Sequence, residues 1–155
     1  TFAKVVVAER YHDLGHGLGI IKGFDMVTGA IGYTVAHDSH NIIIAGVDDK
    51  DMLLAAETLK KIGGGQVVVI NGQVTAMPLP IGGLMSDQYY QTTIDQNRAL
   101  DKAFSKISDV PFDPFLTLSF MALPVIPSLK ITDQGLFDFD KFSFIDIQDA
   151  GEFKS

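Results

Sequence analysis

The chain has 155 residues, of which 46% are hydrophobic and 20% are charged, so it carries enough apolar side chains to fold and is not a disordered tail. Its 12 basic and 19 acidic residues give a formal net charge of −7, which disfavours nucleic acid as a partner because phosphate backbones attract basic surfaces. The absence of cysteine excludes disulfides and cysteine-ligated zinc.

The apolar runs and the opening residues bear on membranes and location. No apolar run approaches the ~20 residues that span a bilayer, so we expect no membrane partner. The opening TFAKVVVAER lacks the basic segment and the apolar stretch of a signal peptide, so we expect a cytoplasmic protein. The first residue is threonine, which indicates a trimmed chain or a piece of a longer one. With no linker or internal repeat, residues 1–155 are expected to form a single domain.

Three strands are predicted in the first third of the chain. Residues 3–8 (AKVVVA) are a β-branched run, residues 29–36 (GAIGYTVA) alternate between bulky and small side chains, and residues 41–47 (NIIIAGV) are apolar on both faces. Residues 15–23 contain four glycines. Because glycine tolerates positive φ, we expect an irregular loop or a kinked strand there.

A helix is predicted to begin after Asp48, an N-cap residue, with Asp49 and Asp51 at the positive end of its dipole. Apolar residues recur on one face at helical spacing: Met52, Ala55, Ala56 and Leu59. Gly63 and the two glycines after it end the helix, the first of them as a left-handed cap.

The dipeptide Asn71-Gly72 separates the runs QVVVI and QVTAM, which predicts a hairpin with a type I′ turn. Further along, Ser86 is expected to cap a second helix over residues 87–107. The apolar stripe of this helix consists of Tyr90, Ile94, Ala103, Phe104 and Ile107.

Strands outnumber helices in this interpretation, and the hairpin requires antiparallel pairing. Pro124 and Pro127 interrupt the aromatic-rich residues 112–144, which we expect to contribute to the core or to an interface. The sequence therefore predicts an α+β domain: a mixed, largely antiparallel β-sheet layer with two main helices packed on it.

The polar motif His37-Asp38-Ser39-His40-Asn41 lies between two predicted strands. If those strands form a tight hairpin, Asp38 and Ser39 occupy the turn. His37 and His40 then become a directly opposed pair with Cβ atoms ~4.5–5.5 Å apart. The same register pairs Val35 with Ile42 and Tyr33 with Ile44.

Two imidazoles and a carboxylate this close together could ligate a metal or move protons, although a His-x-x-His pair needs at least one further ligand from elsewhere. The alternative is a polar turn whose side chains satisfy local backbone groups. His12 and His16 have the spacing of a helical metal pair. Gly15 and Gly17 argue against a helix there, so we expect a mobile surface loop.

Several blocks of the sequence resemble one family. The runs GAIGYTVAHDSHNIIIAGVDDKDM, LPLPIGGLMSD and LTLSFMALPVIPSLKITDQGLFDFDKF, together with the GGG before VVVINGQV, are similar to the C-terminal domain of bacterial adenine deaminase. The segments AERY and GLGIIKGF are similar to it as well. The similarity extends from Val5 to Phe144 and keeps the order of the family's blocks.

The resemblance implies an enzyme of the amidohydrolase superfamily that converts adenine and water to hypoxanthine and ammonia. In that family a divalent metal (manganese, iron or zinc) in a (β/α)₈ barrel activates the water. This chain lacks the family's His-x-His metal ligands and is too short for a barrel of ~250 residues. We therefore expect no metal, no cofactor and no catalytic residue in this chain. The chemistry would belong to a catalytic barrel in the same polypeptide.

The family's Ala-His-Asp-Ser-His-Asn block falls on residues 36–41, which we expect to face the mouth of the barrel. The candidate site residues are His37, Asp38, Ser39, His40 and Asn41. In this interpretation the domain supports or caps the barrel and contributes subunit contacts in a homo-oligomer. The alternatives are a stand-alone interaction or oligomerisation module and a small metal-binding protein or enzyme that uses the His37–His40 turn.

Overall fold

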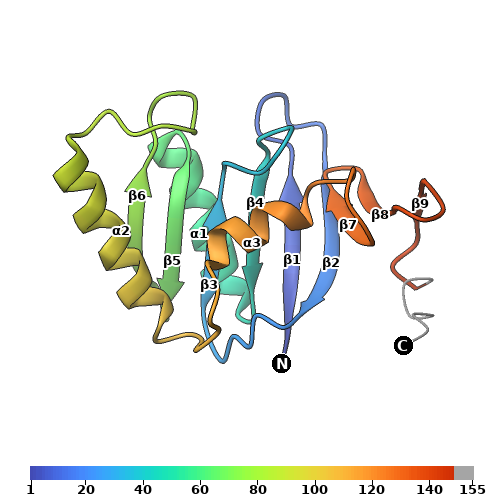
Figure 1. Cartoon of the computed structure of the whole chain (residues 1–155), viewed down its shortest axis with the longest axis horizontal. Coiled ribbons are helices and arrows are strands. Elements are labelled where there is room, and N and C mark those ends of the chain that lie inside the picture. Colours follow the sequence, from blue (N-terminus) through green and yellow to red (C-terminus); the bar gives the residue numbers. More distant parts are fainter. Residues whose placement is uncertain (149–155) are drawn as a thin grey trace.

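The computed structural model describes residues 1–148, which form a six-stranded sheet, a three-stranded sheet and three helices (Figure 1). In chain order the elements are β1 (Phe2–Ala8), β2 (His16–Lys22), β3 (Ala30–Tyr33), β4 (Ile42–Gly46), α1 (Asp49–Ile62), β5 (Gly65–Ile70), β6 (Gln73–Pro78), α2 (Tyr90–Phe104), α3 (Pro114–Met121), β7 (Leu129–Thr132), β8 (Gly135–Asp138) and β9 (Ser143–Ile145). The strand order is β2-β1-β4-β3-β5-β6 in the large sheet and β7-β8-β9 in the small sheet.

All strand pairings within these two sheets are antiparallel. The helix α1 connects β4 to β5, but β3 lies between these two strands, so the crossover creates no parallel pair. The predicted α+β class with a largely antiparallel sheet is confirmed.

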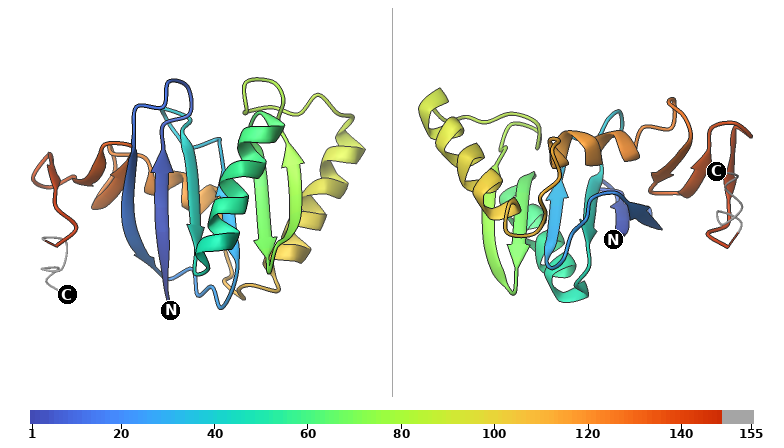
Figure 2. Two further views of the ribbon diagram at one scale, coloured as in Figure 1. Left: turned by 180° about the vertical axis from the view of Figure 1, so that it is seen from behind. Right: turned by 60° about the horizontal axis from the view of Figure 1, so that its bottom comes forward.

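The large sheet separates two layers of the core. The helices α2 and α3 and the small sheet lie on one face, and α1 lies on the other (Figures 1 and 2). The core of the first layer includes Val5, Val7, Ile31, Ile43, Phe104 and Leu118. The core under α1 includes Ile44, Met52, Leu59, Val67 and Val69.

The strand β2 is regular, so the prediction of an irregular loop or kinked strand is wrong for this segment. Its register with β1 places Gly17 and Gly19 on the face that the small sheet covers. A Cβ atom at position 17 would lie 2.0 Å from the carbonyl oxygen of Thr132, and one at position 19 would crowd side chains of β7 and β8 at 3.2 Å. These glycines therefore serve the close approach of two sheets rather than a turn.

The helix predicted after Asp48 is confirmed as α1. The side chain of Asp48 accepts hydrogen bonds from the backbone N–H groups of Lys50 (2.9 Å) and Asp51 (3.0 Å). Gly63 ends the helix in the left-handed conformation with a φ of 76°.

The predicted hairpin is confirmed as β5–β6. Both turn residues have positive φ, 50° at Asn71 and 78° at Gly72, as a type I′ turn requires. Asp51 of α1 is 3% exposed, and its carboxylate accepts hydrogen bonds from the backbone N–H groups of both turn residues at 2.8 Å. The sequence predicts only a favourable interaction of Asp51 with the helix dipole. The structure shows that its carboxylate also links α1 to the β5–β6 turn.

The second predicted helix is shorter than expected. It begins at Tyr90 rather than at Asp87, since the hydroxyl of Ser86 accepts the backbone N–H of Gln88 (3.1 Å) and does not cap α2. The helix ends at Phe104. Within the predicted apolar stripe, Tyr90 and Ile94 are exposed, and the buried members are Ala103, Phe104 and Ile107.

A third helix, α3, is not among the predicted elements. Asp113 caps it by accepting hydrogen bonds from the backbone N–H groups of Phe115 (2.9 Å) and Leu116 (3.0 Å). Pro114 occupies the first helical turn, where its missing N–H costs no hydrogen bond. Across residues 1–148, none of the helices combines the length and the apolar composition that a membrane-spanning helix requires.

Candidate functional site

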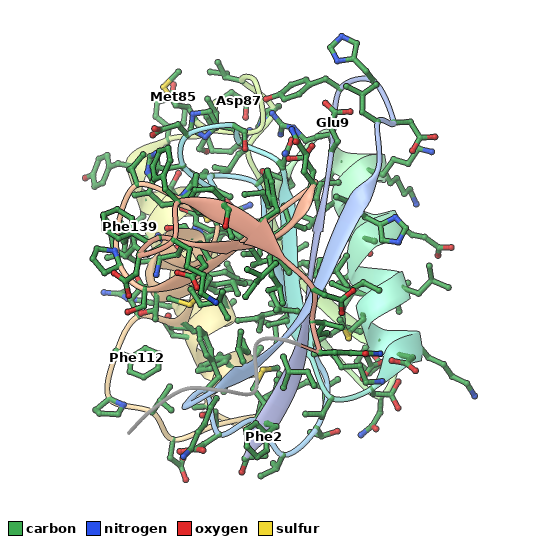
Figure 3. The ribbon with its side chains drawn as sticks, turned by 90° about the vertical axis from the view of Figure 1, so that its right-hand side faces the viewer. Phe2, Glu9, Met85, Asp87, Phe112 and Phe139 are labelled. Atoms are coloured by element: carbon green, nitrogen blue, oxygen red, sulfur yellow. The ribbon has the colours of Figure 1, made fainter. Side chains whose placement is uncertain are left out.

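Several connections meet at one end of the large sheet, here termed the loop end (Figure 1). They are residues 9–15, 34–41, 63–64 and 79–89. Glu9 and Met85 lie at this end, and Phe2 lies at the opposite one (Figure 3). The candidate site residues belong to the second of these connections.

The connection between β3 and β4 is longer than the predicted two-residue turn. The observed register pairs Tyr33 with Ile43 rather than with Ile44. The ladder with β4 ends at Tyr33, whereas the backbone N–H of the next residue still donates to a carbonyl of β5 at 3.1 Å. The predicted register, including the Val35–Ile42 pair, and the tight hairpin that carried it are therefore wrong.

His37 and His40 nevertheless lie side by side. Their ring centroids are 5.4 Å apart, and the ring planes meet at 68°. A turn brings them together: the backbone N–H of His40 donates to the carbonyl of Ala36 at 2.7 Å, and His40 has a left-handed φ of 53°. Both imidazoles are half-buried. The Nδ1 atom of His40 is buried and has no hydrogen-bond partner within residues 1–148.

The other three candidate residues divide into an exposed tip and a buried anchor. Asp38 and Ser39 are exposed, so they offer a carboxylate and a hydroxyl to solvent. Asn41 is 3% exposed, and its Nδ2 donates to Oδ1 of Asp133 in the β7–β8 turn at 3.2 Å. Asn41 therefore holds the loop against the small sheet rather than presenting it to a partner.

A buried threonine joins the candidate loop to its neighbours. The hydroxyl of Thr34 donates to the carbonyl of Gly83 at 2.7 Å and accepts the backbone N–H of Gly65 at 2.8 Å. These bonds link the end of β3, the start of β5 and the connection before α2. Because a buried hydroxyl left unpaired costs about 1–3 kcal/mol, the bonds fix the relative position of the three segments.

Arg10 reaches from the first connection to the last. Its Nη2 donates to the carbonyl of Gly82 (2.6 Å) and to the hydroxyl of Tyr11 (2.7 Å), and its guanidinium carbon lies 4.7 Å from the centroid of the Tyr11 ring. The guanidinium packs so closely on Gly83 that a Cβ atom there would lie 1.7 Å from Nη1. This Nη1 is buried and has no hydrogen-bond partner in the described part of the chain.

Sequence reasoning did not identify Arg10, Thr34 or Gly83 as site residues. The available signal was the pair of adjacent glycines in the apolar connector LPIGGLMS, since paired glycines mark positive φ or a close approach of backbone. Both glycines do have positive φ, 66° at Gly82 and 74° at Gly83.

Glu9 keeps the β1–β2 connection closed. Its carboxylate accepts hydrogen bonds from the backbone N–H groups of Tyr11 (2.9 Å), His12 (2.6 Å) and Leu14 (3.4 Å). Burial acts to raise the pKa of Glu9, but these N–H groups and the nearby His12 outweigh it, so the pKa lies below its ordinary value of 4.5. The carboxylate is therefore ionised and remains an acceptor at neutral pH.

The histidines do not assemble a metal site within the described residues. His12 is exposed in the β1–β2 connection and His16 begins β2, so the two do not share a helix. Across residues 1–148, no three His, Asp or Glu side chains gather as they would around a metal ion. His37 and His40 supply two donors without a third, which does not satisfy the four-ligand preference of zinc.

A hollow of about 310 Å³ lies at the end of the sheet opposite to the loop end. Asp25, Val27 and residues 105–111 line it. None of the candidate site residues contributes to its walls, so this hollow and the loop end are separate features of the domain.

Comparison with known proteins assigns the chain to a family. The profile described as Adenine deaminase C-terminal domain matches residues 1–143. Over 149, 149 and 148 residues respectively, the chain is 74% identical to the adenine deaminase of Leuconostoc mesenteroides, 73% to that of Leuconostoc citreum and 67% to adenine deaminase 1 of Oenococcus oeni. These matches cover 96%, 96% and 94% of this chain but 27% of each relative, so the chain spans about a quarter of the relatives' length. The resemblance seen in the sequence blocks is thereby confirmed: the chain belongs to the adenine deaminase C-terminal domain family.

Proposed function

We propose that this chain is the C-terminal part of an enzyme that hydrolyses adenine to hypoxanthine and ammonia, and that it supports or caps the catalytic barrel of that enzyme. The observation that carries the proposal is the 67–74% identity to adenine deaminases over nearly the whole chain but only 27% of their length. The bond-breaking chemistry then belongs to the larger upstream part of the polypeptide.

The metal of the reaction also belongs to that upstream part in this proposal. An amidohydrolase-type manganese, iron or zinc centre activates water for attack on the purine and is built on a His-x-His pair with further ligands. His37 and His40 are separated by two residues, and no third ligand gathers with them within residues 1–148. The residues present do not fit such a centre, so no catalytic step is assigned to them.

The loop end is the part of the domain that we place at the mouth of the barrel. Asp38 and Ser39 are exposed there, and the buried Nδ1 of His40 lacks a partner within the described residues. Arg10 and Thr34 brace the connections behind them. A braced loop that exposes a carboxylate and a hydroxyl suits a surface that closes an active site or holds adjoining loops in place.

We further propose that residues 1–155 act as one domain of a cytoplasmic homo-oligomer. Two core layers share the same large sheet, which supports one cooperative unit, although residues 149–155 lie outside the described part. The exposed side chains of Tyr89 and Tyr90 support a role in subunit contacts, where aromatic residues are enriched. A single thermal unfolding transition of the chain, and a full-length enzyme larger than a monomer by sedimentation, are the expected results.

Deaminase assays test the assigned reaction. The full-length protein is expected to convert adenine and water to hypoxanthine, releasing one ammonia per turnover. Residues 1–155 alone, supplied with Mn²⁺, Fe²⁺ or Zn²⁺, should release none above background. Ammonia release by the isolated chain at an enzyme-like rate would move the chemistry to the His37–His40 turn. A full-length protein that leaves adenine unchanged would refute the assigned reaction.

A further inference from the structure

The two faces of strands β1 and β2 differ sharply in burial. On the face that carries α2, α3 and the small sheet, Val5 and Val7 of β1 are fully buried. On the other face α1 packs on β3, β4 and β5 (Figure 2). Val6 of β1 touches the edge of this layer, and the rest of β1 and β2 is left uncovered. We term this uncovered side the open face; it is formed by Phe2, Lys4, Val6, His16, Leu18, Ile20 and Lys22.

The open face is dominated by large apolar side chains. The register pairs Val6 with Leu18 and Lys4 with Ile20, so these side chains form one continuous surface across the two strands. Phe2 is 67% exposed, Leu18 is 55% exposed and Ile20 is 65% exposed. His16 and Lys22 lie at the two ends of this face, but Val6, Leu18 and Ile20 are apolar at its centre. A strand with one face in water ordinarily carries polar residues there.

The flank of α1 extends the open face. Asp49 pairs with Lys4 of β1, which fixes the first turn of the helix beside the strand. Leu53 is four residues further along, on the same flank of the helix, and is 62% exposed. The ion pair offsets the charge of Lys4 at this border, so an apolar surface continues from the strands to the flank of α1.

An exposed apolar surface of this kind beside an edge strand favours association with a partner that covers it. The chain matches the C-terminal domain of its family and only 27% of each relative's length. In a protein that carries it as its C-terminal domain, the larger part of the polypeptide lies upstream, on the N-terminal side of β1. A tethered neighbour at that point meets the open face at about millimolar effective concentration, which favours it over a second copy of the chain.

We propose that the open face packs against the upstream catalytic part of the same polypeptide. This inference rests on the proposed function and adds a second contact to the one at the loop end. The strand β1 runs along the open face from Phe2 to Ala8, where the loop end begins. A single neighbouring domain can therefore cover the open face and also contact the loop that contains His37 and His40.

Single cysteines in the full-length enzyme test the inference: Leu18→Cys, Ile20→Cys and Val74→Cys, each labelled with a maleimide and quantified by peptide mass. Val74 is the matched control. It pairs with Val69, a core residue under α1, so it lies on the same face of the sheet at the opposite edge, and it is 42% exposed. If nothing covers the open face, positions 18 and 20 should label at least as fast as position 74.

The proposal predicts that positions 18 and 20 label at least about tenfold more slowly than position 74, because thiol labelling follows exposure. Equal or faster labelling overturns it. Protection that is lost on dilution also overturns it, since a second copy then covers the face. Adenine deamination is measured on the same proteins. A protected face on an inactive protein refutes the proposed function alone, and an accessible face on an active enzyme refutes this inference alone.

Discussion

The two ends of the large sheet use buried polar side chains in different ways. At the end opposite to the loop end, both carboxylate oxygens of Asp51 accept hydrogen bonds from backbone N–H groups of the β5–β6 turn. At the loop end Thr34 is satisfied just as fully, but Nη1 of Arg10 and Nδ1 of His40 are buried without a partner within residues 1–148. Buried polar atoms are rarely left unpaired, so the two ends differ in how fully their buried polar groups are satisfied within residues 1–148.

The largest effect on stability is expected at the end of the sheet that contains Asp51 and the β5–β6 turn. Asp51→Ala leaves two turn N–H groups unpaired and should lower the free energy of unfolding by about 2–4 kcal/mol, measured by chemical denaturation. Asp49→Ala is the control, because it removes an exposed carboxylate from the same helical turn and should cost about 0–1 kcal/mol. In the full-length enzyme Asp51→Ala should leave kcat/KM unchanged below its melting temperature. A fall in kcat/KM there would erase the distinction between the two ends.

A glycine pair at the loop end offers a smaller and more local perturbation. Gly83→Ala places a methyl group against the guanidinium of Arg10 at a φ of 74° and should cost about 1–3 kcal/mol. Gly82→Ala has nearly the same φ, 66°, but its new methyl group would make only an ordinary contact at 4.0 Å with Leu84, so backbone strain alone remains. Thermal unfolding of both variants measures the difference. Equal losses of stability in the two variants would mean that the packing of the Arg10 guanidinium on Gly83 does not contribute to stability.

Protonation of Glu9 should loosen the loop end without affecting the other end. The folded-state pKa of Glu9 lies below the ordinary value, so its stabilising effect is present above about pH 4.5 and is lost as the pH falls through the lowered folded-state pKa. The protection factors of residues 9–15 against hydrogen exchange should therefore fall in acid before those of the β5–β6 turn. Glu9→Gln should show the lower protection already at neutral pH. An acid-induced loss of protection that persists unchanged in Glu9→Gln would assign it to another group.

Local signals were sufficient for the elements whose residues determine their own backbone. Asp48 and Gly63 marked the two ends of α1, and Asn71-Gly72 marked the hairpin, because caps and type I′ turns depend on neighbouring residues alone. The helix α3 also has a local signal, because Asp113 is its N-cap and Pro114 is its first residue. The aromatic composition of the segment favoured a core or interface interpretation instead.

Long-range contacts decided the features that the sequence did not predict. The regularity of β2 depends on Gly17 facing a backbone more than a hundred residues away in sequence, at Thr132. The path of the candidate loop depends on Thr34, which bonds to Gly65 of β5 and to Gly83 in the connection before α2. The spatial proximity of His37 and His40 was expected, but through a hairpin that does not form. Packing between distant segments cannot be read from residue spacing.

The most direct test of the account is kcat/KM for adenine deamination by full-length enzyme carrying His37→Ala and His40→Ala together. The account predicts a loss of about tenfold or more, equivalent to roughly 1.4 kcal/mol of transition-state stabilisation, with an unchanged melting temperature. The double variant His12→Ala and His16→Ala, which removes two exposed imidazoles near the loop end, should keep its activity. An unchanged kcat/KM in the His37 and His40 variant, at unchanged stability, would show that the candidate loop does not serve the active site.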